Sequence, residues 1–208
     1  QYLNTKFKQT GHDNVYLPLL IPESLFQKEK DHVDGFAPAT AMVTTTGKED
    51  LNEKLIIRPT SEVLFCTHFK SIVQSHRDLP KKYNQWCSVV RWEKTTRPFL
   101  RGKEFLWQEG HTIHASEQEA KDETMGMLSI YETLGKELLA IPFVTGRKTE
   151  KEKFAGAEAT YSIEALMPDG QALQSGTTHY FGQGFAKAFE ISYRDQENQE
   201  QFVYQTSW

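Results

Sequence analysis

The chain has 208 residues, of which 38% are hydrophobic and 12% aromatic, so it can bury a substantial core and is not disordered. Its 24 basic and 28 acidic residues give a formal net charge of −4, which excludes a general polycation, so any contact with nucleic acid must be local. No apolar run approaches the roughly 18 residues of a membrane helix, and no signal peptide is visible. Cys66 and Cys87 form no CxxC pattern, so we expect two reduced, buried thiols in an intracellular protein.

The first part of the chain is predicted to begin with an edge or interface strand. Residues 14–22 are apolar and β-rich, but Pro18 lies among them and cannot donate to a central ladder. Residues 23–36 have a helical pattern that should end near Gly35. Two further strands are expected at residues 41–47 and 54–59.

The middle of the chain is predicted to contain two helices around a pair of strands. Thr60 is a plausible N-cap for a helix over residues 60–73, where apolar residues recur near helical spacing. The two strands are expected at residues 85–93 and 103–114. The clearest helix spans residues 116–140, because Ser116 and Glu119 form a capping box before a periodic apolar run.

The last third of the chain is expected to be mainly β-structure. Residues 159–167 and 171–182 are separated by Pro-Asp-Gly, which predicts a hairpin. More strand is expected at residues 188–195 and 201–208. Together with the helices, this pattern predicts an α+β fold in which an antiparallel sheet has helices to one side.

The segment between the two middle strands carries Arg91 and Arg101, ten positions apart. Both arginines could simply be solvated, or paired with the nearby acids Glu93 and Glu104. Alternatively, guanidinium groups from opposite limbs of a hairpin can grip the oxygens of a phosphate or a carboxylate.

The strand after this segment favours the second interpretation. Four of its side chains are expected on one face, because strand side chains alternate: Phe105, Trp107, Glu109 and His111. A face with a carboxylate and an imidazole is poor core material, since a buried charge is costly without partners. It suits a pocket for a small charged molecule, although Trp107 and His111 could also belong to an ordinary core.

These residues resemble a known family. The pattern R-x-E, loop, R-x-x-x-F resembles motif 2 of the class II aminoacyl-tRNA synthetases and is formed by Arg91, Glu93, Arg101 and Phe105. Gly11 and Pro18 resemble the marks of motif 1, an interface strand. Residues 58–62 (RPTSE) resemble the T-x-E loop of the subclass that includes the prolyl and threonyl enzymes.

Two longer segments, residues 99–112 and 153–191, look specifically like the prolyl-tRNA synthetases, in the form that lacks an inserted editing domain. The resemblance runs over nearly the whole chain and implies the catalytic core of a class II synthetase. The G-x-x-x-R motif 3 and the anticodon-binding domain are not found in residues 1–208. The chain starts at Gln1 instead of Met and stops at Trp208 inside a strand-like run, so we expect an excised piece. Because motif 3 is absent, the resemblance implies the first part of a catalytic domain, carrying motifs 1 and 2.

The resemblance implies an aminoacyl-tRNA ligase that joins ATP and L-proline to give prolyl-adenylate and transfers the prolyl group to tRNA(Pro). The catalytic residue would be Arg91, which would bridge the substrate carboxylate and the α-phosphate. The ATP-binding residues would be Arg91, Glu93, Arg101, Phe105, Gln174 and Thr177. The proline-binding residues would be Thr60, Glu62, Arg91, Trp107, Glu109, His111, Phe154 and His179.

The resemblance also implies partners. Mg²⁺ would accompany ATP, and no residue of the chain is assigned as a metal ligand. Pro18 implies a homodimer through the motif-1-like strand, the alternative being a plain edge strand. The acceptor end of tRNA should reach residues 94–103, where Lys94, Arg97 and Lys103 could meet phosphates. A cytoplasmic location without membrane association is expected.

Other functions stay open at this point. A threonyl or seryl enzyme is one, although the threonyl enzymes hold zinc with cysteine and histidine, and neither Cys66 nor Cys87 lies in such a cluster. A non-catalytic synthetase-like protein that binds tRNA, an amino acid or a partner protein is another, although Arg91 and Arg101 argue for ATP handling. A simple nucleotide-binding module would leave the pocket residues unexplained.

Overall fold

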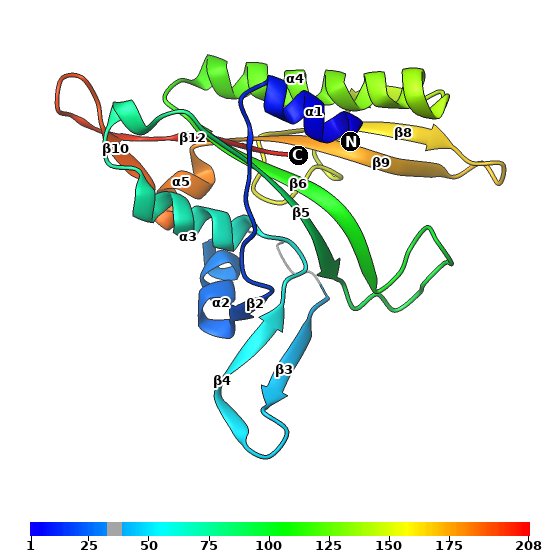
Figure 1. Ribbon diagram of the computed structural model, residues 1–208, viewed down its shortest axis with the longest axis horizontal. Helices are drawn as coiled ribbons and strands as arrows, with labels where there is room; N and C mark the ends of the chain where they lie inside the picture. Colours follow the sequence, from blue (N-terminus) through cyan, green and yellow to red (C-terminus); the bar gives the residue numbers. More distant parts are fainter. Residues whose placement is uncertain (33–38) are drawn as a thin grey trace.

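A seven-stranded sheet forms the centre of the computed structural model, which describes residues 1–32 and 39–208 (Figure 1). Its strand order is β1–β5–β6–β12–β9–β8–β7, and every neighbouring pair is antiparallel except β1 with β5. The strands are β1 (Asp13–Asn14), β5 (Lys81–Val90), β6 (Glu104–His114), β12 (Tyr204–Ser207), β9 (Ala172–Gly182), β8 (Ala159–Leu166) and β7 (Val144–Arg147). The predicted α+β class with an antiparallel sheet is confirmed.

Strands β5 and β6 form the predicted pair on either side of the two arginines. They pair from Lys81 opposite Ile113 to Val90 opposite Glu104, so the intervening loop leaves the sheet at one end of both strands. Strand β5 is rich in aromatic and β-branched residues, which fit a pleated surface. Along β6 the odd-numbered side chains point to one face of the sheet and the even-numbered ones to the other.

Helices cover both faces of this sheet, whereas the sequence predicted helices on one side (Figure 1). They are α1 (Tyr2–Gln9), α3 (Glu62–Ile72), α4 (Glu117–Thr133) and α5 (Gly184–Phe189). On one face, Met127 of α4 shares an apolar cluster with Ile163 of β8. On the other, Phe65 of α3 shares a cluster with Ile113 of β6. The prediction was wrong because the apolar stripe of a helix shows that it packs on a sheet, but not on which face.

A second, three-stranded sheet projects from the body as an arm (Figure 1). Its antiparallel strands are, in order, β2 (Leu20–Pro22), β4 (Asp50–Ile57) and β3 (Ala41–Thr45), and α2 (Glu23–His32) lies against β2 and β4. The strands predicted at residues 41–47 and 54–59 are confirmed. The predicted helix end near Gly35 lies outside the described residues.

The strand predicted over residues 14–22 is wrong as one continuous element, because the segment is divided between the two sheets. Between β1 and β2 the chain forms no ladder of its own. Instead, the backbone N–H of Leu17 donates to the side-chain oxygen of Gln85 at 2.5 Å. Pro18, which follows, has no N–H to donate to a neighbouring strand.

Two predicted element boundaries are also wrong. The N-cap position of α3 is occupied by Ser61 and not by Thr60, whose hydroxyl donates to Glu62 Oε2 at 2.5 Å. The strand predicted at residues 188–195 begins only at Ser192, because the preceding residues complete α5. There the short strand β10 (Ser192–Arg194) pairs with β11 (Glu200–Phe202).

The helix predicted at residues 116–140 begins as expected and changes character near its end. Ser116 and Glu119 form the predicted capping box at the start of α4. After Thr133 the chain continues as a π-helical segment (Leu134–Leu139), and Ala140 then takes a left-handed conformation with φ 51°. A single turn of 3₁₀-helix (His76–Asp78) completes the regular structure of the described residues.

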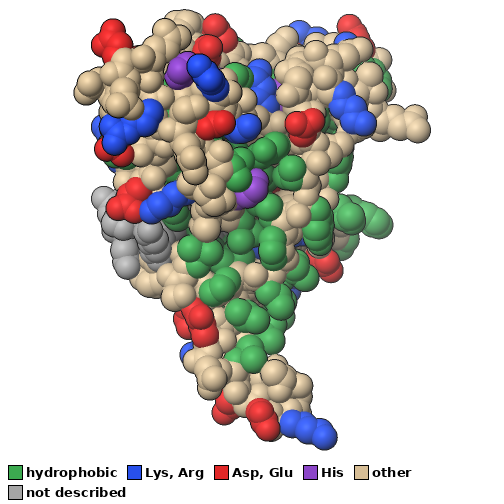
Figure 2. Space-filling model, turned by 60° about the vertical axis from the view of Figure 1, so that its left-hand side comes forward, with side chains coloured by type: hydrophobic (Ala, Val, Ile, Leu, Met, Phe, Trp, Pro, Cys, Tyr) green, Lys and Arg blue, Asp and Glu red, His purple; other side chains and the backbone are tan. Residues whose placement is uncertain are grey.

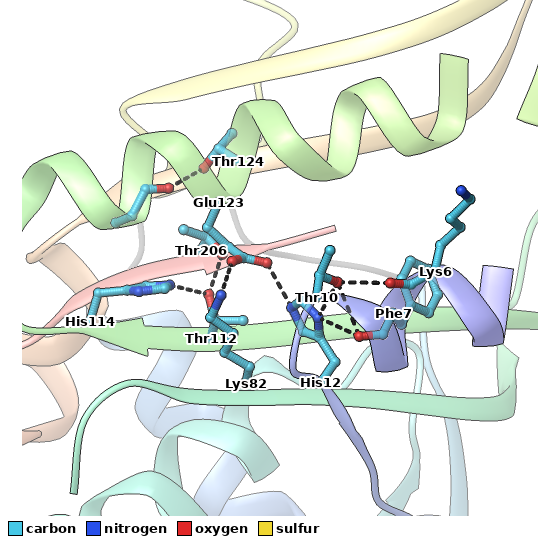
Figure 3. A network of polar contacts seen from close by, with 11 residues as sticks. Lys6, Phe7, Thr10, His12, Lys82, Thr112, His114, Glu123, Thr124 and Thr206 are labelled. Carbon is cyan, nitrogen blue, oxygen red and sulfur yellow. Dashed lines mark hydrogen bonds and ion pairs between the residues drawn. The ribbon is translucent and has the colours of Figure 1, made fainter. Parts of the chain in front are cut away.

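A buried polar network ties the start of the chain to α4 (Figure 3). Glu123 on α4 has one oxygen 2.7 Å from His12 Nε2 and the other 2.6 Å from Lys82 Nζ on β5. Burial raises the pKa of Glu123, but the hydrogen bonds from His12 and Lys82 outweigh it and hold the pKa below its ordinary value. Thr10 binds the other ring nitrogen of His12, with Oγ1 2.9 Å from Nδ1.

Within the part of the chain that the structure describes, no helix combines the length and the apolar character that crossing a membrane requires. Cys66 and Cys87 are both buried and are not joined in a disulfide, as the sequence predicted.

Acid should destabilise the fold through His114, which is 2% exposed on β6. Burial lowers the pKa of His114 to about 4, against an opposing effect of Glu123. An unfolded histidine has a pKa of about 6.5 and therefore binds a proton more readily than the folded one between these values. Stability is thus lost as the pH falls through this window, by up to about 3 kcal/mol for this residue.

The measurement is urea unfolding of the wild-type chain and of His114→Gln between about pH 7 and about pH 4.5. The variant loses packing at neutral pH but carries no proton-linked penalty, so the stability advantage of the wild type should shrink on acidification. An advantage that stays constant across this range would contradict the assignment.

Candidate active site

A cavity of about 180 Å³ lies where β6, β9 and β12 meet the start of α3 and the segment before β8. The residues that line it are Thr60, Glu62, Arg91, Trp107, Glu109, His111, Lys148, Glu152, Phe154, Thr160, Gln174, Thr177, His179, Ser207 and Trp208. The odd-numbered residues of β6 reach it because they share the face that α3 covers. Segments from across the chain therefore converge on one small hollow.

Most of the residues that the sequence nominated are brought together in this cavity. Those that line it are Thr60, Glu62, Arg91, Trp107, Glu109, His111, Phe154, Gln174, Thr177 and His179. Phe105 lines an adjoining cavity of about 530 Å³, which also includes Arg91 and Trp107. Glu93 and Arg101 lie on the loop after β5 and line neither of these two cavities.

Arg91 is held in place by its inner nitrogen. Its Nε donates to the carbonyl of Pro59 at 3.0 Å, and its guanidinium carbon lies 5.2 Å from the centre of the Trp107 ring and 5.5 Å from that of Phe105. No other hydrogen bond of the Arg91 side-chain nitrogens occurs within the described part of the chain. Burial lowers the pKa of Arg91, although nearby acids, of which Glu62 acts most strongly, oppose this. An arginine stays a cation at neutral pH, so its outer nitrogens can meet an anion.

Glu109 is a buried carboxylate surrounded by donors. Its Oε1 accepts from Ser61 Oγ at 2.5 Å and from Gln85 Nε2 at 3.1 Å, while Oε2 accepts from Ser61 N at 3.2 Å. His111 Nε2 lies 3.0 Å from Oε2. Burial raises the pKa of Glu109, but the hydrogen bonds from His111, Ser61 and Gln85 together outweigh it and lower the pKa. Glu109 is therefore ionised, both of its oxygens accept hydrogen bonds from the protein, and it orients His111.

Glu62 is the second buried carboxylate and has far fewer donors. It is 6% exposed, and Thr60 Oγ1 donates to it. Burial raises the pKa of Glu62, and Glu109 adds to this, while His111 acts in the opposite direction. A cation placed beside Glu62 would favour its ionised form.

Glu62, Glu109 and His111 could also be considered as a metal site, since their ligand atoms lie within 4.8 Å of one another. However, Glu109 and His111 already bond to each other, and both oxygens of Glu109 accept from the protein. The donor set therefore suits an ammonium group beside Glu62 better than a divalent ion.

Another part of the cavity lining contains the uncharged rings of Phe154 and His179. The Phe154 ring lies 4.7 Å from the His179 ring, and Thr160 links them by accepting from Phe154 N at 3.0 Å and bonding His179 Nδ1 at 2.9 Å. Burial lowers the pKa of His179 to about 3, so this imidazole is uncharged at neutral pH. The cavity lining thus combines the buried carboxylates of Glu62 and Glu109 with uncharged rings.

The loop after β5 projects from the end of the β5–β6 pair (Figure 1). The Arg101 side chain is 66% exposed and lies 3.9 Å from Glu93, while Arg97 lies 3.2 Å from Asp169 in the β8–β9 turn. At its tip Phe99 is fully exposed with a positive φ of 62°. The structure therefore brings Arg91 into the cavity and leaves Arg101 on the loop, so their joint grip on one ligand stays a prediction.

Five lining residues were missed from the sequence: Lys148, Glu152, Thr160, Ser207 and Trp208. Ser207 is opposite His111 in the β12–β6 ladder, a pairing between strands almost a hundred positions apart that no local pattern reveals. The charged run around Lys148 and Glu152 was visible but is typical of a solvated loop. Ser61 and Gln85, which hold Glu109, carry no sequence signal of this role.

The sequence pattern that defines the tRNA synthetase class II core domain (G, H, P, S and T) matches residues 44–207. The match includes the β5–β6 pair, Arg91 and the other nominated site residues. The chain belongs to the class II aminoacyl-tRNA synthetases.

Within that family, its relatives include proline–tRNA ligases. The ligases of Phytoplasma australiense and Clostridium novyi are each 66% identical over 208 residues, which is all of this chain but 44% of each relative. The chain thus spans less than half the length of the relatives it matches. Prolyl-tRNA synthetase from Cryptosporidium parvum, solved with halofuginone and AMPPNP, superposes with a TM-score of 0.93 at 43% identity, over 99% of this chain and 41% of that one. A second structure of that enzyme, with L-proline and AMP, gives a TM-score of 0.92 at 40% identity over the same shares of the two chains.

Replacing Gly110, which lies between the two site residues Glu109 and His111, should distort β6. A Cβ there would lie 2.0 Å from the Trp208 ring, so Gly110→Ala should lower stability by about 1–3 kcal/mol and weaken ligand binding. Gly126 on α4 has nothing within 4 Å of its added Cβ, so Gly126→Ala is the matched control. The free energy of unfolding of Gly126→Ala should rise by up to about 1 kcal/mol, because alanine has a higher helix propensity than glycine. Thermal unfolding of both variants tests this, and equal effects would contradict it.

Proposed function

We propose that the full-length protein containing this chain is a prolyl-tRNA synthetase, which activates L-proline with ATP and transfers the prolyl group to tRNA(Pro). The observation that carries this proposal is the cavity itself. Its lining includes the Arg91 guanidinium, the buried Glu62 carboxylate with few hydrogen-bond donors, and the uncharged rings of Phe154 and His179. An amino acid with a compact apolar ring, a cationic amine and a carboxylate matches all three features.

Arg91 is the residue that makes the first reaction possible. A carboxylate attacks the α-phosphate of ATP, and since it is already ionised at neutral pH, no general base is needed. Two unit charges about 4 Å apart repel by roughly 4 kcal/mol at an effective dielectric constant near 20. Arg91 offsets this repulsion by bonding to both anions and stabilises the charge that develops as the new bond forms and pyrophosphate leaves. Its anchor on Pro59 keeps it oriented.

The ATP end of the site lies along the adjoining cavity. Phe105 supports the adenine ring, and Gln174 and Thr177 lie where both cavities meet. Arg101 binds the γ-phosphate and Glu93 binds the adenine amino group or a metal ion, which requires the exposed loop to fold inward over the nucleotide. Mg²⁺ enters with ATP as the counter-ion of the triphosphate and is part of the substrate.

The amino-acid end recognises the amine and the ring separately. Glu62 and Thr60 accept from the secondary ammonium, and the carboxylate makes that bond charge-assisted. Trp107, Phe154, His111 and His179 enclose the ring, with His111 oriented by Glu109. Cys66 and Cys87 do not belong to the group of metal-capable residues found in the described chain, which speaks against a zinc-dependent threonyl pocket.

The larger assembly follows from the same assignment. Residues 1–208 supply the part of a catalytic domain that contains motifs 1 and 2, and motif 3 and the anticodon-binding domain belong to the remaining length of the protein. Figure 2 shows hydrophobic side chains gathered in a band that runs down onto the arm. The exposed apolar residues of β2, β3 and the segment before β2 include Tyr16, Leu19, Leu20 and Met42, which supports a homodimer around Pro18. The loop with Lys94, Arg97 and Lys103 meets the tRNA acceptor end in the cytoplasm.

The decisive experiment is isothermal titration of the full-length protein with non-hydrolysable prolyl-, threonyl- and seryl-adenylate analogues. The prolyl analogue should bind at least about tenfold more tightly than the others, and Arg91→Ala should weaken it by about a hundredfold or more. Arg77→Ala, which removes an exposed arginine outside the site, is the control. Equal binding of the three analogues would exclude proline specificity. Binding of an ATP analogue without preference for any adenylate would favour a nucleotide-binding module.

Affinity for L-proline should depend on pH through Glu62. Because burial raises the pKa of Glu62, its carboxylate is lost as the pH falls through that raised value, and with it the attraction for the ammonium group. The Kd for L-proline should therefore increase on acidification. Glu62→Gln should bind more weakly by about tenfold or more at neutral pH and should lose this pH dependence. Titration at several pH values tests this, and an identical pH profile in the variant would contradict it.

A further inference from the structure

The segment between β1 and β2 is held to the body of the protein by side chains that reach toward the cavity. The backbone N–H of Leu17 donates to Gln85 Oε1 at 2.5 Å, and its carbonyl accepts from Arg58 Nη1 at 2.8 Å. Gln85 and Arg58 are both 0% exposed. The backbone N–H and C=O of Leu17, which is not part of a β-ladder, are thus each satisfied by a buried side chain.

The other end of the Gln85 amide belongs to the cavity wall. Its Nε2 donates to Glu109 Oε1 and to Ser61 Oγ, both at 3.1 Å. Gln85 does not itself line the cavity. One planar amide group therefore accepts from the segment on its oxygen and donates to the Glu109 carboxylate on its nitrogen.

Arg58 provides a second, parallel connection. Besides the Leu17 carbonyl, it donates from Nε to the carbonyl of Ser88 on β5 at 2.9 Å. The residue after it, Pro59, offers the carbonyl that anchors Arg91 at 3.0 Å. The position of Leu17 is thus linked through one side chain to Glu109 and through another to the backbone that holds Arg91.

We propose that Gln85 is a positioning residue that couples the segment at residues 15–19 to the substrate pocket by holding Leu17 and Glu109 with the two ends of one amide. The inference rests on the proposed function and deepens it. When Leu17 shifts, the amide turns with it, because oxygen and nitrogen are parts of one rigid plane, and Glu109 loses a donor. Glu109 orients His111, so the change reaches the wall that encloses the amino acid.

Coupling of this kind must act in both directions. If the position of the segment alters affinity for the amino acid, then binding of the amino acid must restrain the segment by the same free energy. The segment also contains Pro18 and the exposed residues Tyr16 and Leu19, so a second copy bound there would act on the pocket through the same amide.

The test is hydrogen exchange of the peptide that covers residues 15–20 in the full-length protein, with and without the prolyl-adenylate analogue. Wild-type protein should exchange the Leu17 amide at least about fivefold more slowly when the analogue is bound. Gln85→Met keeps the side-chain length but removes both the acceptor and the donor, so this protection should disappear. It should also raise the KM for L-proline by about tenfold while the KM for ATP stays nearly constant.

The matched control is Gln205→Met. Gln205 is a glutamine of similar burial on β12, whose amide nitrogen lies 3.5 Å from Cys66 Sγ and which does not line the cavity. This variant should retain the ligand-induced protection and a normal KM for L-proline. A purely structural role of Gln85 would instead lower the fraction of active protein and kcat, with both KM values unchanged.

The outcomes separate this inference from the proposed function. If wild-type protein binds the prolyl analogue and the exchange at residues 15–20 is unaffected, the coupling is refuted and the function stands. The coupling is equally refuted if Gln85→Met keeps the protection. If wild-type protein binds no prolyl analogue, both proposals fall together. The wild-type comparison is sufficient even where Gln85→Met does not fold.

Discussion

Removing a carboxylate from water costs several kcal/mol unless donors replace the water, and Glu109 is 3% exposed in the centre of the molecule. The donors come from Ser61 at the start of α3, Gln85 on β5 and His111 on β6. Each must stand within about 3 Å of one of two oxygens, so the relative placement of these elements is restricted by a single charged group. The depth and shape of the cavity depend on this restriction.

The contrast between Glu109 and Glu62 shows how one cavity can hold two carboxylates of different character. Burial acts on both in the same direction, and the difference lies in the number of donors. Glu109 is satisfied by the protein and serves as a structural anion. Glu62 has fewer donors, chiefly the Thr60 hydroxyl, and burial raises its pKa. Under the proposed function, this distinction assigns recognition of the amine to Glu62 and not to Glu109.

Much of the site was accessible from the sequence because its signals are local. The period of two along β6 predicted a common face for Trp107, Glu109 and His111, and the structure places all three in the cavity. The capping box of α4 and the β8–β9 hairpin were likewise predicted from a few adjacent residues. The position of Ser207 in the cavity could not be predicted in this way, since it depends on the pairing of β12 with β6, which is distant in the sequence.

Errors at element boundaries have a related origin. Residues 14–22 have the composition of one strand, but Leu17 is held by the buried side chains of Gln85 and Arg58, which propensity does not register. Thr60 and Ser61 both belong to residue types that often cap helices, but neither side chain caps α3, because the Thr60 hydroxyl donates to Glu62 and the Ser61 hydroxyl donates to Glu109. In both places a tertiary contact to the polar centre overrides the local preference.

Strand β6 uses its odd-numbered side chains for the cavity and its even-numbered ones, such as Thr112 and His114, for packing under α4. Insertion or deletion of one residue within it would exchange the two sets and turn Trp107, Glu109 and His111 away from the cavity. The exposed loop before β6 does not depend on this alternation of side chains. Among related sequences, length variation should therefore accumulate in that loop, while the strand tolerates replacement but not a change of length.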